Sequence, residues 1–229
     1  MMSSTADISI IILFKQKDKK FKKAFASAQF AKEVITIKHD QINDFSQARN
    51  QALKKASYQW VFFLDSDEVI SHESITEIKK IIQANLLDGV LINRQDIFYK
   101  KIIEYGEAGN VKLLRMGKRD KMTWQRPVHE VAAIDGVVGD SNIKITHYAH
   151  SSLIDFIASV IGYAEIEARY RKRLNKNIIF LELITFPIIK FAHNYFIKRG
   201  FLDGWRGLSY ALIMSLHSFS VRVFQYELK

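Results

Sequence analysis

Residues 60–68 read WVFFLDSDE, and this stretch decides the fold class. Its first five residues are apolar without interruption, which is typical of a strand buried on both faces of a parallel sheet. The strand ends abruptly at Asp65, and Asp67 and Glu68 follow within three positions. Because ligands of open α/β sheets bind beyond the carboxyl ends of the strands, we expect these three carboxylates to lie together at a binding edge.

Strand-like and helix-like stretches alternate on both sides of this strand. The predicted strands cover residues 8–14, 33–38, 60–64 and 89–93, with shorter ones at 111–116, 131–134 and 143–148. The predicted helices cover residues 15–31, 46–57 and 74–84, and Ser46 is the expected N-cap of the second. This alternation predicts an α/β fold with a mainly parallel sheet flanked by helices.

Charge divides the chain of 229 residues into two parts. Residues 1–150 carry the α/β pattern, whereas residues 151–229 predict helices and hold eleven Lys and Arg against six Asp and Glu. The net charge of the whole chain is +10, and such a charge favours anionic partners. We therefore expect a core domain over 1–150 and a basic, amphipathic helical extension over 151–229.

Composition excludes several classes of protein and of site. The chain has no cysteine, so it has no disulfide, no zinc–thiolate site and no thiol nucleophile. The apolar run at 8–14 is too short to span a bilayer and lacks the flanks of a signal peptide. The apolar stretch at 178–197 is interrupted by Glu182, Pro187 and Lys190, which argues against a membrane span. No nucleic-acid-binding signature accompanies the basic charge, so we expect no nucleic-acid partner.

The D-x-D pattern of Asp65 and Asp67 suits a divalent cation. Clustered carboxylates repel one another unless a hard cation or hydrogen-bond donors neutralise them. Mg²⁺ and Mn²⁺ prefer oxygen ligands and commonly share their coordination shell with substrate phosphates. The structural alternative is a polar turn in which an aspartate caps the next helix.

A longer block of sequence carries a family resemblance. Residues 44–68, DFSQARNQALKKASYQWVFFLDSDE, resemble family 2 glycosyltransferases of GT-A (Rossmann-like) fold, and most closely the branch of lipopolysaccharide-core and other cell-envelope sugar transferases. The positions in register with that branch are Phe45, Ser46, Arg49, Asn50, Ala52, Ala56, Trp60, Leu64, Asp65, Asp67 and Glu68. Residues 111–136, 146–152 and 191–215 extend the resemblance over most of the chain. It implies an inverting, metal-dependent transferase that takes its sugar from a nucleotide-diphosphate sugar, most often a UDP-sugar.

The resemblance also implies roles for single residues. Asp65 and Asp67 are expected to bind Mn²⁺ or Mg²⁺ at the donor diphosphate, and His147 to complete the metal site. Arg49 is expected to reach the diphosphate or the base-binding loop. Glu130 is the best candidate for the general base, because a carboxylate beside an imidazole can be tuned for proton transfer.

The remaining candidates line the expected acceptor side or the donor loop. Trp124 and Arg126 are expected to shape the acceptor pocket, and His129 to order the loop that carries Glu130. The nucleotide-binding half is shorter than in the family, because a helix and a strand of the family pattern are absent before Asp44. Asp40 is expected to contact the donor in place of the missing loop. The shortening leaves one alternative, a non-catalytic GT-A-like binding or scaffold protein.

The basic extension suggests where the acceptor lies. Residues 169–176, RYRKRLNK, hold five basic side chains next to the apolar stretch at 178–197. This combination fits an anionic membrane surface, and the alternative is that the helices pack on one another or in a homo-oligomer. Together with the resemblance, it predicts a glycan or lipid-linked cell-envelope acceptor and a cytoplasmic protein peripheral to the inner face of the membrane.

Overall fold

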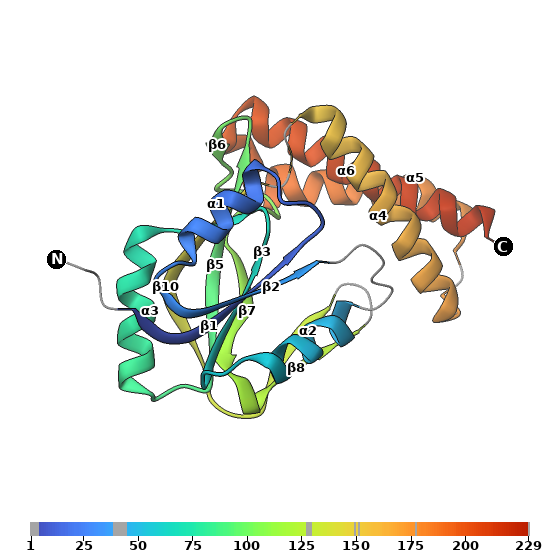
Figure 1. Ribbon diagram of the computed structural model, residues 1–229. Coiled ribbons are helices and arrows are strands. Elements are labelled where there is room, and N and C mark those ends of the chain that lie inside the picture. Colours follow the sequence, from blue (N-terminus) through green and yellow to red (C-terminus); the bar gives the residue numbers. More distant parts are fainter. Residues whose placement is uncertain are drawn as a thin grey trace. The chain divides into compact units, whose positions relative to one another are not determined.

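The computed structural model describes residues 5–38, 45–126, 130–148, 150, 152–176 and 178–228 (Figure 1). The chain forms two units. The first comprises Met1–Arg94 and Val111–Tyr148, and the second comprises Gln95–Asn110 and Ala149–Lys229. The segment 95–110 therefore folds together with the C-terminal helices, although the sequence places it between two strands of the sheet.

A mixed β-sheet forms the centre of the first unit. Its strands are β1 (Ala6–Phe14), β2 (Ala31–Lys38), β3 (Trp60–Asp65), β4 (Glu68–Ile70), β5 (Gly89–Phe98), β6 (Lys101–Ile102), β7 (Val111–Lys118) and β10 (Val138–His147). The strand order is β2-β1-β3-β7-β5-β10-β4, and β6 pairs with the end of β5. β1 pairs in parallel with β2 and β3, whereas β7 pairs antiparallel with both β3 and β5. The predicted α/β class is confirmed, and β7 is an antiparallel strand inserted among strands that share one direction.

Both faces of this sheet are covered, and the alternation of side chains along β1 and β3 shows how. Ile10 and Phe62 belong to a core that includes α1 (Lys19–Ser27) and α3 (His72–Ala84). Ile11 and Phe63 belong to a second core with α2 (Phe45–Lys55) and the hairpin of β8 (Met122–Gln125) and β9 (Val131–Ile134), which follows the short 3-10 helix η1 (Arg119–Lys121). α1 and α3 thus lie on one face and α2 on the other (Figure 1).

Side-chain caps fix where the helices begin. The Asp18 carboxylate accepts a hydrogen bond from the Phe21 N–H at 2.9 Å and starts α1, and Ser71 caps α3. α2 begins at Phe45, so Ser46 lies inside its first turn and the expectation that Ser46 is the N-cap is wrong. The N-caps Asp18 and Ser71 therefore fix the positions of the loops that follow β1 and β4.

The second unit is helical, as its sequence predicts. It contains α4 (Leu153–Arg173), α5 (Phe180–Ala192), the π-helix η2 (His193–Ile197), the 3-10 helix η3 (Gly200–Asp203) and α6 (Trp205–Glu227). Phe98 and Ile103, from the segment 95–110, pack in one core with Phe156 and Ile213. The Asp203 carboxylate accepts the Tyr105 N–H at 2.9 Å and so fixes this segment to the helices. Across the described helices, none is long and apolar enough to cross a membrane.

The turn before α6 depends on a close approach of two glycines. A Cβ atom at Gly207 would lie 1.8 Å from the carbonyl oxygen of Gly200. A side chain there forces the backbone apart, because a carbonyl oxygen in a tight turn cannot rotate away. At Gly162, in α4, a Cβ atom meets nothing within 4 Å.

These two glycines give a matched pair of substitutions. We expect Gly207→Ala to lower the free energy of unfolding by about 3 kcal/mol, because of the backbone clash. We expect Gly162→Ala to raise it by about 1 kcal/mol, because alanine is the better helix former. Urea denaturation followed by circular dichroism measures both, and equal stabilities of the two variants would contradict the packing described for the turn.

Candidate functional site

A cluster of charged side chains lies where β3 ends. Asp65 is the last residue of β3, and its two carboxylate oxygens accept hydrogen bonds from two arginines. Arg49 Nη2 lies 2.8 Å from Oδ1, and Arg115 Nη2 lies 2.9 Å from Oδ2. Arg49 comes from α2 and Arg115 from β7, the antiparallel neighbour of β3. The aspartate is therefore held between two cations that belong to different elements.

Arg49 joins two parts of this cluster. Its side chain is only 3% exposed, and its Nε donates a hydrogen bond to Glu130 Oε1 at 3.1 Å while Nη2 binds Asp65. The guanidinium lies over the indole ring of Trp124, with 4.6 Å to the ring centroid. A planar guanidinium can make these contacts at once because its donors form a rigid fork and its faces stack on aromatic rings.

The neighbouring residue on α2 fixes the strand that supports Arg49. Asn50 donates from Nδ2 to the Trp124 carbonyl oxygen and accepts the Trp124 N–H at Oδ1, each at 2.9 Å. These two hydrogen bonds satisfy both backbone groups of Trp124, as a neighbouring strand would, and attach β8 to α2. The Arg-Asn dipeptide thus has two tasks: Arg49 binds the carboxylates, and Asn50 positions the ring on which Arg49 stacks.

Glu68 points into the protein and not to the binding edge. Its side chain is 0% exposed, and Oε2 accepts the Asp65 N–H at 3.0 Å. Burial, reinforced by the negative charge of Asp65, raises the pKa of the Glu68 carboxyl. The expectation that Asp65, Asp67 and Glu68 all lie at the edge is therefore wrong for Glu68. Because β4 pairs with β10, Glu68 is buried in the sheet and stabilises the turn between β3 and β4 through the hydrogen bond that it accepts from the Asp65 N–H.

Asp67 lies beside a histidine from the last strand of the sheet. β10 pairs antiparallel with β4, so that His147 stands opposite Glu68. His147 Nε2 lies 3.6 Å from Asp67 Oδ2, and the Tyr148 N–H donates to the Asp67 carbonyl oxygen at 2.8 Å. Both side chains are partly exposed. Backbone pairing therefore holds this Asp-His pair beside the end of β3.

The charges of the cluster oppose the effect of burial. Burial alone would raise the pKa of the Asp65 carboxyl, but Arg115 and Arg49 outweigh it and hold this pKa well below its usual range. Burial would likewise lower the pKa of Arg115, and Asp65 and Glu68 raise it instead. Asp65 is therefore ionised near neutral pH. Four buried polar atoms of the cluster have no hydrogen-bond partner among the described residues: Arg49 Nη1, Arg115 Nη1, Glu68 Oε1 and Trp124 Nε1.

Asp67 and His147 are the residues of the site that would hold a divalent cation. The described ranges contain no group of three or more His, Asp or Glu side chains that could hold a metal ion by themselves. Both oxygens of Asp65 already accept hydrogen bonds from arginine. Asp67 and His147 are close enough to supply two ligands to one ion, and Mn²⁺ or Mg²⁺ commonly takes its other ligands from water and substrate phosphates. The residues present fit an ion that is bound together with a phosphate ligand.

The sequence candidates differ in how the structure places them. Asp65, Arg49, Glu130 and Trp124 form one connected cluster, and Asp67 and His147 form the adjacent pair. Arg126 follows β8 as an exposed residue with φ of +68°. Asp40 and His129 lie outside the described residues. Arg115 was missed by the sequence analysis, although an arginine within the apolar stretch VKLLRM at 111–116 signals a buried charge that needs a partner.

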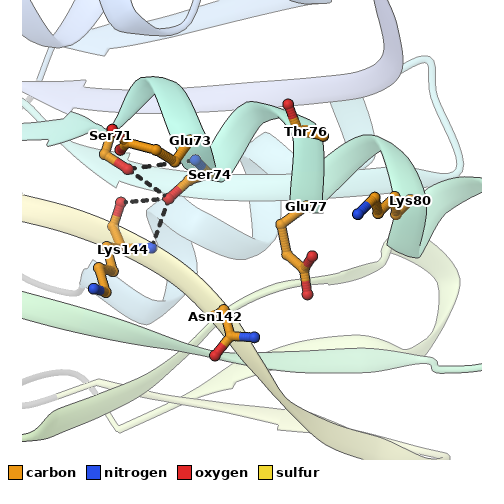
Figure 2. Close-up of a pocket in the computed structure, with 8 residues that line it drawn as sticks. All are labelled: Ser71, Glu73, Ser74, Thr76, Glu77, Lys80, Asn142 and Lys144. Atoms are coloured by element: carbon orange, nitrogen blue, oxygen red, sulfur yellow. Dashed lines mark hydrogen bonds between the residues drawn. The ribbon is translucent and has the colours of Figure 1, made fainter.

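Two polar hollows lie elsewhere on the first unit. One, of about 400 Å³, runs between α3 and β10 (Figure 2). Figure 2 shows the hydrogen bonds between the Ser74 hydroxyl and the backbone of Lys144. Ser74 therefore helps to pack α3 on β10. The other, of about 360 Å³, follows α2 and is bordered by Ser46, Gln47, Asn50, Gln51 and Lys54. Asn50 connects this second hollow to the charged cluster, because it is adjacent to Arg49 in the helix.

Comparison with known proteins gives the class of this fold. The structure is similar to the mannosyltransferase PcManGT from Pyrobaculum calidifontis in complex with GDP-Man and Mn²⁺, with a TM-score of 0.51 and 10% identity over 98% of this chain and 88% of that chain. It also matches TarS of S. aureus with a TM-score of 0.42 and 13% identity, over 96% of this chain and 55% of that one. The fold is that of the GT-A glycosyltransferases, as the sequence predicts.

The family follows from the sequence match. The family described as Glycosyl transferase family 2 matches residues 17–134, more than half of the chain, and the chain belongs to this family. A curated relative, the TPR repeat-containing protein Synpcc7942_0270 of Synechococcus elongatus, is 30% identical over 96 residues. That match covers 40% of this chain and 22% of the length of the relative.

The opposite pKa shifts of Asp65 and Glu68 predict opposite effects of neutralising them. We expect Asp65→Asn to lower the free energy of unfolding at pH 7 by about 2 kcal/mol or more, because it leaves Arg49 and Arg115 without their shared counter-ion. Because the pKa of Asp65 is lowered by folding, this loss is full above the unfolded pKa of about 3.9 and shrinks as the pH falls below it.

Glu68→Gln is the matched substitution. It keeps the acceptor for the Asp65 N–H and removes a carboxyl whose ionised form is disfavoured by burial, so we expect stability at pH 7 equal to or above that of the wild type. Urea denaturation between pH 3 and pH 7 measures both variants. Equal destabilisation by the two substitutions would contradict the electrostatics of the cluster.

Proposed function

We propose that this chain transfers a sugar from a nucleotide-diphosphate sugar to a hydroxyl group of an acceptor. The observation that carries the proposal is the bridge from Asp65 through Arg49 to Glu130, which joins the end of β3 to a carboxylate of a distant loop. Membership of glycosyl transferase family 2 and the GT-A fold support the same activity. Such a transfer requires stabilisation of a leaving diphosphate and removal of a proton from the acceptor.

The donor diphosphate is bound at the edge formed by β3, β7 and β10. Asp67 and His147 would hold Mn²⁺ or Mg²⁺, which would supply Lewis-acid stabilisation of the charge on the leaving diphosphate. Asp65 keeps Arg49 and Arg115 in place, and these guanidiniums provide a positive environment for the same phosphates. The Mn²⁺ in the complex of the structurally similar mannosyltransferase is in keeping with this assignment.

Glu130 acts as the general base. The acceptor oxygen attacks the anomeric carbon and forms the new glycosidic bond, while the bond from that carbon to the phosphate oxygen breaks with its electron pair on the diphosphate. Glu130 takes the proton of the attacking hydroxyl, and the single displacement inverts the configuration at the anomeric carbon. Arg49 positions the carboxylate for this step through its hydrogen bond to Oε1. Trp124, Arg126 and His129 lie along the same stretch of chain and belong to the acceptor side.

The remaining assignments follow the resemblance to the cell-envelope branch. We propose a UDP-sugar donor, with Asp40 contacting the nucleotide, and a lipid-linked or lipopolysaccharide acceptor. Residues 1–150 form the transferase core and residues 151–229 a basic extension that brings the protein to the inner face of the cytoplasmic membrane. The excess of basic residues in that extension supports an anionic surface as the partner.

A second candidate function is a non-catalytic binding or scaffold protein with a degenerate donor site. The observation in its favour is that β2 is an edge strand, with β1 as its neighbour in the strand order, as a shortened nucleotide-binding half requires. Against it stands the cost of burying Arg49 and its partners, since a site without a ligand has no need of buried, clustered charges.

Two substitutions separate metal-assisted donor binding from base catalysis. The assay is release of nucleoside diphosphate from UDP-N-acetylglucosamine and from GDP-mannose in the presence of Mn²⁺. We expect Asp67→Ala to abolish release and to weaken donor binding, while the fold is kept because the substitution leaves the backbone hydrogen bond from Tyr148 to Asp67 in place. We expect Glu130→Gln to lower the turnover rate about 100-fold or more with donor binding retained.

The control is Asp140→Ala, which removes an exposed carboxylate that pairs with Lys112 on the same unit. It should leave both binding and turnover unchanged. Full activity of Asp67→Ala would overturn the metal assignment. Loss of donor binding in Glu130→Gln would move Glu130 from the role of base to that of donor ligand.

A further inference from the structure

Helix α5 presents an unusual surface. None of its 13 residues is buried, although most of them are apolar. Five apolar side chains of α5 expose more than half of their area: Phe180, Leu181, Ile184, Ile188 and Ile189. Residues spaced three, four and seven apart lie on one face of a helix, so Leu181, Ile184 and Ile188 form a continuous stripe. An apolar stripe of this kind on a soluble surface marks a site of association.

The opposite side of α5 is already occupied. Arg222 of α6 lies over the ring of Phe186, with 4.2 Å to the centroid, and Ser215 of α6 donates a hydrogen bond to the Pro187 carbonyl oxygen at 2.8 Å. Packing on α6 therefore fixes the orientation of α5. The stripe of Leu181, Ile184 and Ile188 is the side that this packing leaves uncovered.

Exposed basic residues stand at both ends of the helix. Arg173, the last residue of α4, and Lys176 precede α5, whereas Lys198 and Arg199 follow η2, which continues α5; all four are exposed. Phe196 and Ile197, directly before the second basic pair, are also exposed. In the part of 173–199 that the structure describes, every exposed charged side chain is basic, since Glu182 is only partly exposed. An apolar stripe between two cationic ends complements a surface with an apolar interior and an anionic face.

We propose that α5 is an interfacial anchor that lies flat on an anionic lipid bilayer, with the stripe of Leu181, Ile184 and Ile188 in the headgroup boundary and the four flanking cations on lipid phosphates. This inference deepens the membrane location included in the proposed function and assigns it to one helix face. Even together with the five residues of η2 that continue it, the 13 residues of α5 are too short to cross a hydrocarbon core of about 30 Å, so the helix lies in the plane of the surface.

The charges favour a bilayer over a second copy of the chain. Two copies that met through α5 would bring like-charged ends together, in a protein that already carries a net charge of +10. Like charges at an interface oppose association, whereas lipid phosphates neutralise them. The occupant of this face is therefore an anionic membrane.

The test is binding of the full chain to lipid vesicles, measured by co-sedimentation. One set contains phosphatidylcholine alone, and the other contains phosphatidylcholine mixed with phosphatidylglycerol. We expect binding to the anionic vesicles only, and weaker binding at high salt because salt screens the contacts of the exposed cations. Equal binding to both sets, or none to either, would overturn the proposal.

Two pairs of variants locate the contact. Ile184→Glu with Ile188→Glu places charge in the stripe, and Leu86→Glu with Val137→Glu does the same at exposed apolar positions of the first unit. Arg173→Glu with Lys198→Glu reverses the charge at the ends of α5, and Lys22→Glu with Lys80→Glu reverses two exposed lysines of the first unit. We expect both α5 pairs to lower the vesicle affinity about tenfold or more and both control pairs to leave it nearly unchanged.

Three readouts keep the interpretation unambiguous. Circular dichroism checks that each variant folds, and the charge-reversal pair tests the proposal independently of the stripe. Light scattering tests the second-copy alternative: a wild-type dimer that becomes monomeric in the Ile184→Glu, Ile188→Glu variant, with vesicle binding unchanged, would overturn the proposal. Nucleotide binding on the same samples reports on the transferase separately, and we expect it to be unaffected in the α5 variants.

Discussion

The ion pairs of Arg49 hold this site together. A buried guanidinium is costly unless its charge and its donors are satisfied, and Arg49 meets this need with Asp65, Glu130 and the face of Trp124. Each partner comes from a different element, so the charge that stabilises the cluster also fixes the relative positions of a strand end, a loop and a helix. If Arg49 is removed, Asp65 and Glu130 lose the hydrogen-bond donor that they share.

The sheet topology supplies the other half of the site. β7 lies next to β3 and brings Arg115 to Asp65 Oδ2, the carboxylate oxygen that Arg49 does not bind. The pairing of β10 with β4 brings His147 to Asp67. The buried Glu68 carboxyl accepts the Asp65 N–H and so fixes the backbone at the end of β3. The result is an edge that combines two arginines with an adjoining Asp-His pair, an arrangement that suits a phosphate ligand and its cation.

The sequence predicted the parts of the site that depend on local pattern. The apolar strand that ends in Asp65 and Asp67 could be located from residues 60–68, and the resemblance singled out Arg49 and Glu130. Contacts between strands far apart in the sequence could not be predicted, because no local pattern states which strand lies beside β3. For that reason the sequence analysis missed Arg115 and the antiparallel direction of β7. The inward orientation of Glu68 likewise depends on the pairing of β4 with β10, which lies far away in the sequence.

The cluster around Arg49 is the proposed donor site. Titration calorimetry tests it most directly, with UDP, GDP, CDP and ADP added in turn to the full chain in Mn²⁺ and then in EDTA. The account predicts that one of the four nucleotides binds in Mn²⁺ and that EDTA abolishes the binding. Absence of binding for all four nucleotides would contradict it and would favour the scaffold function.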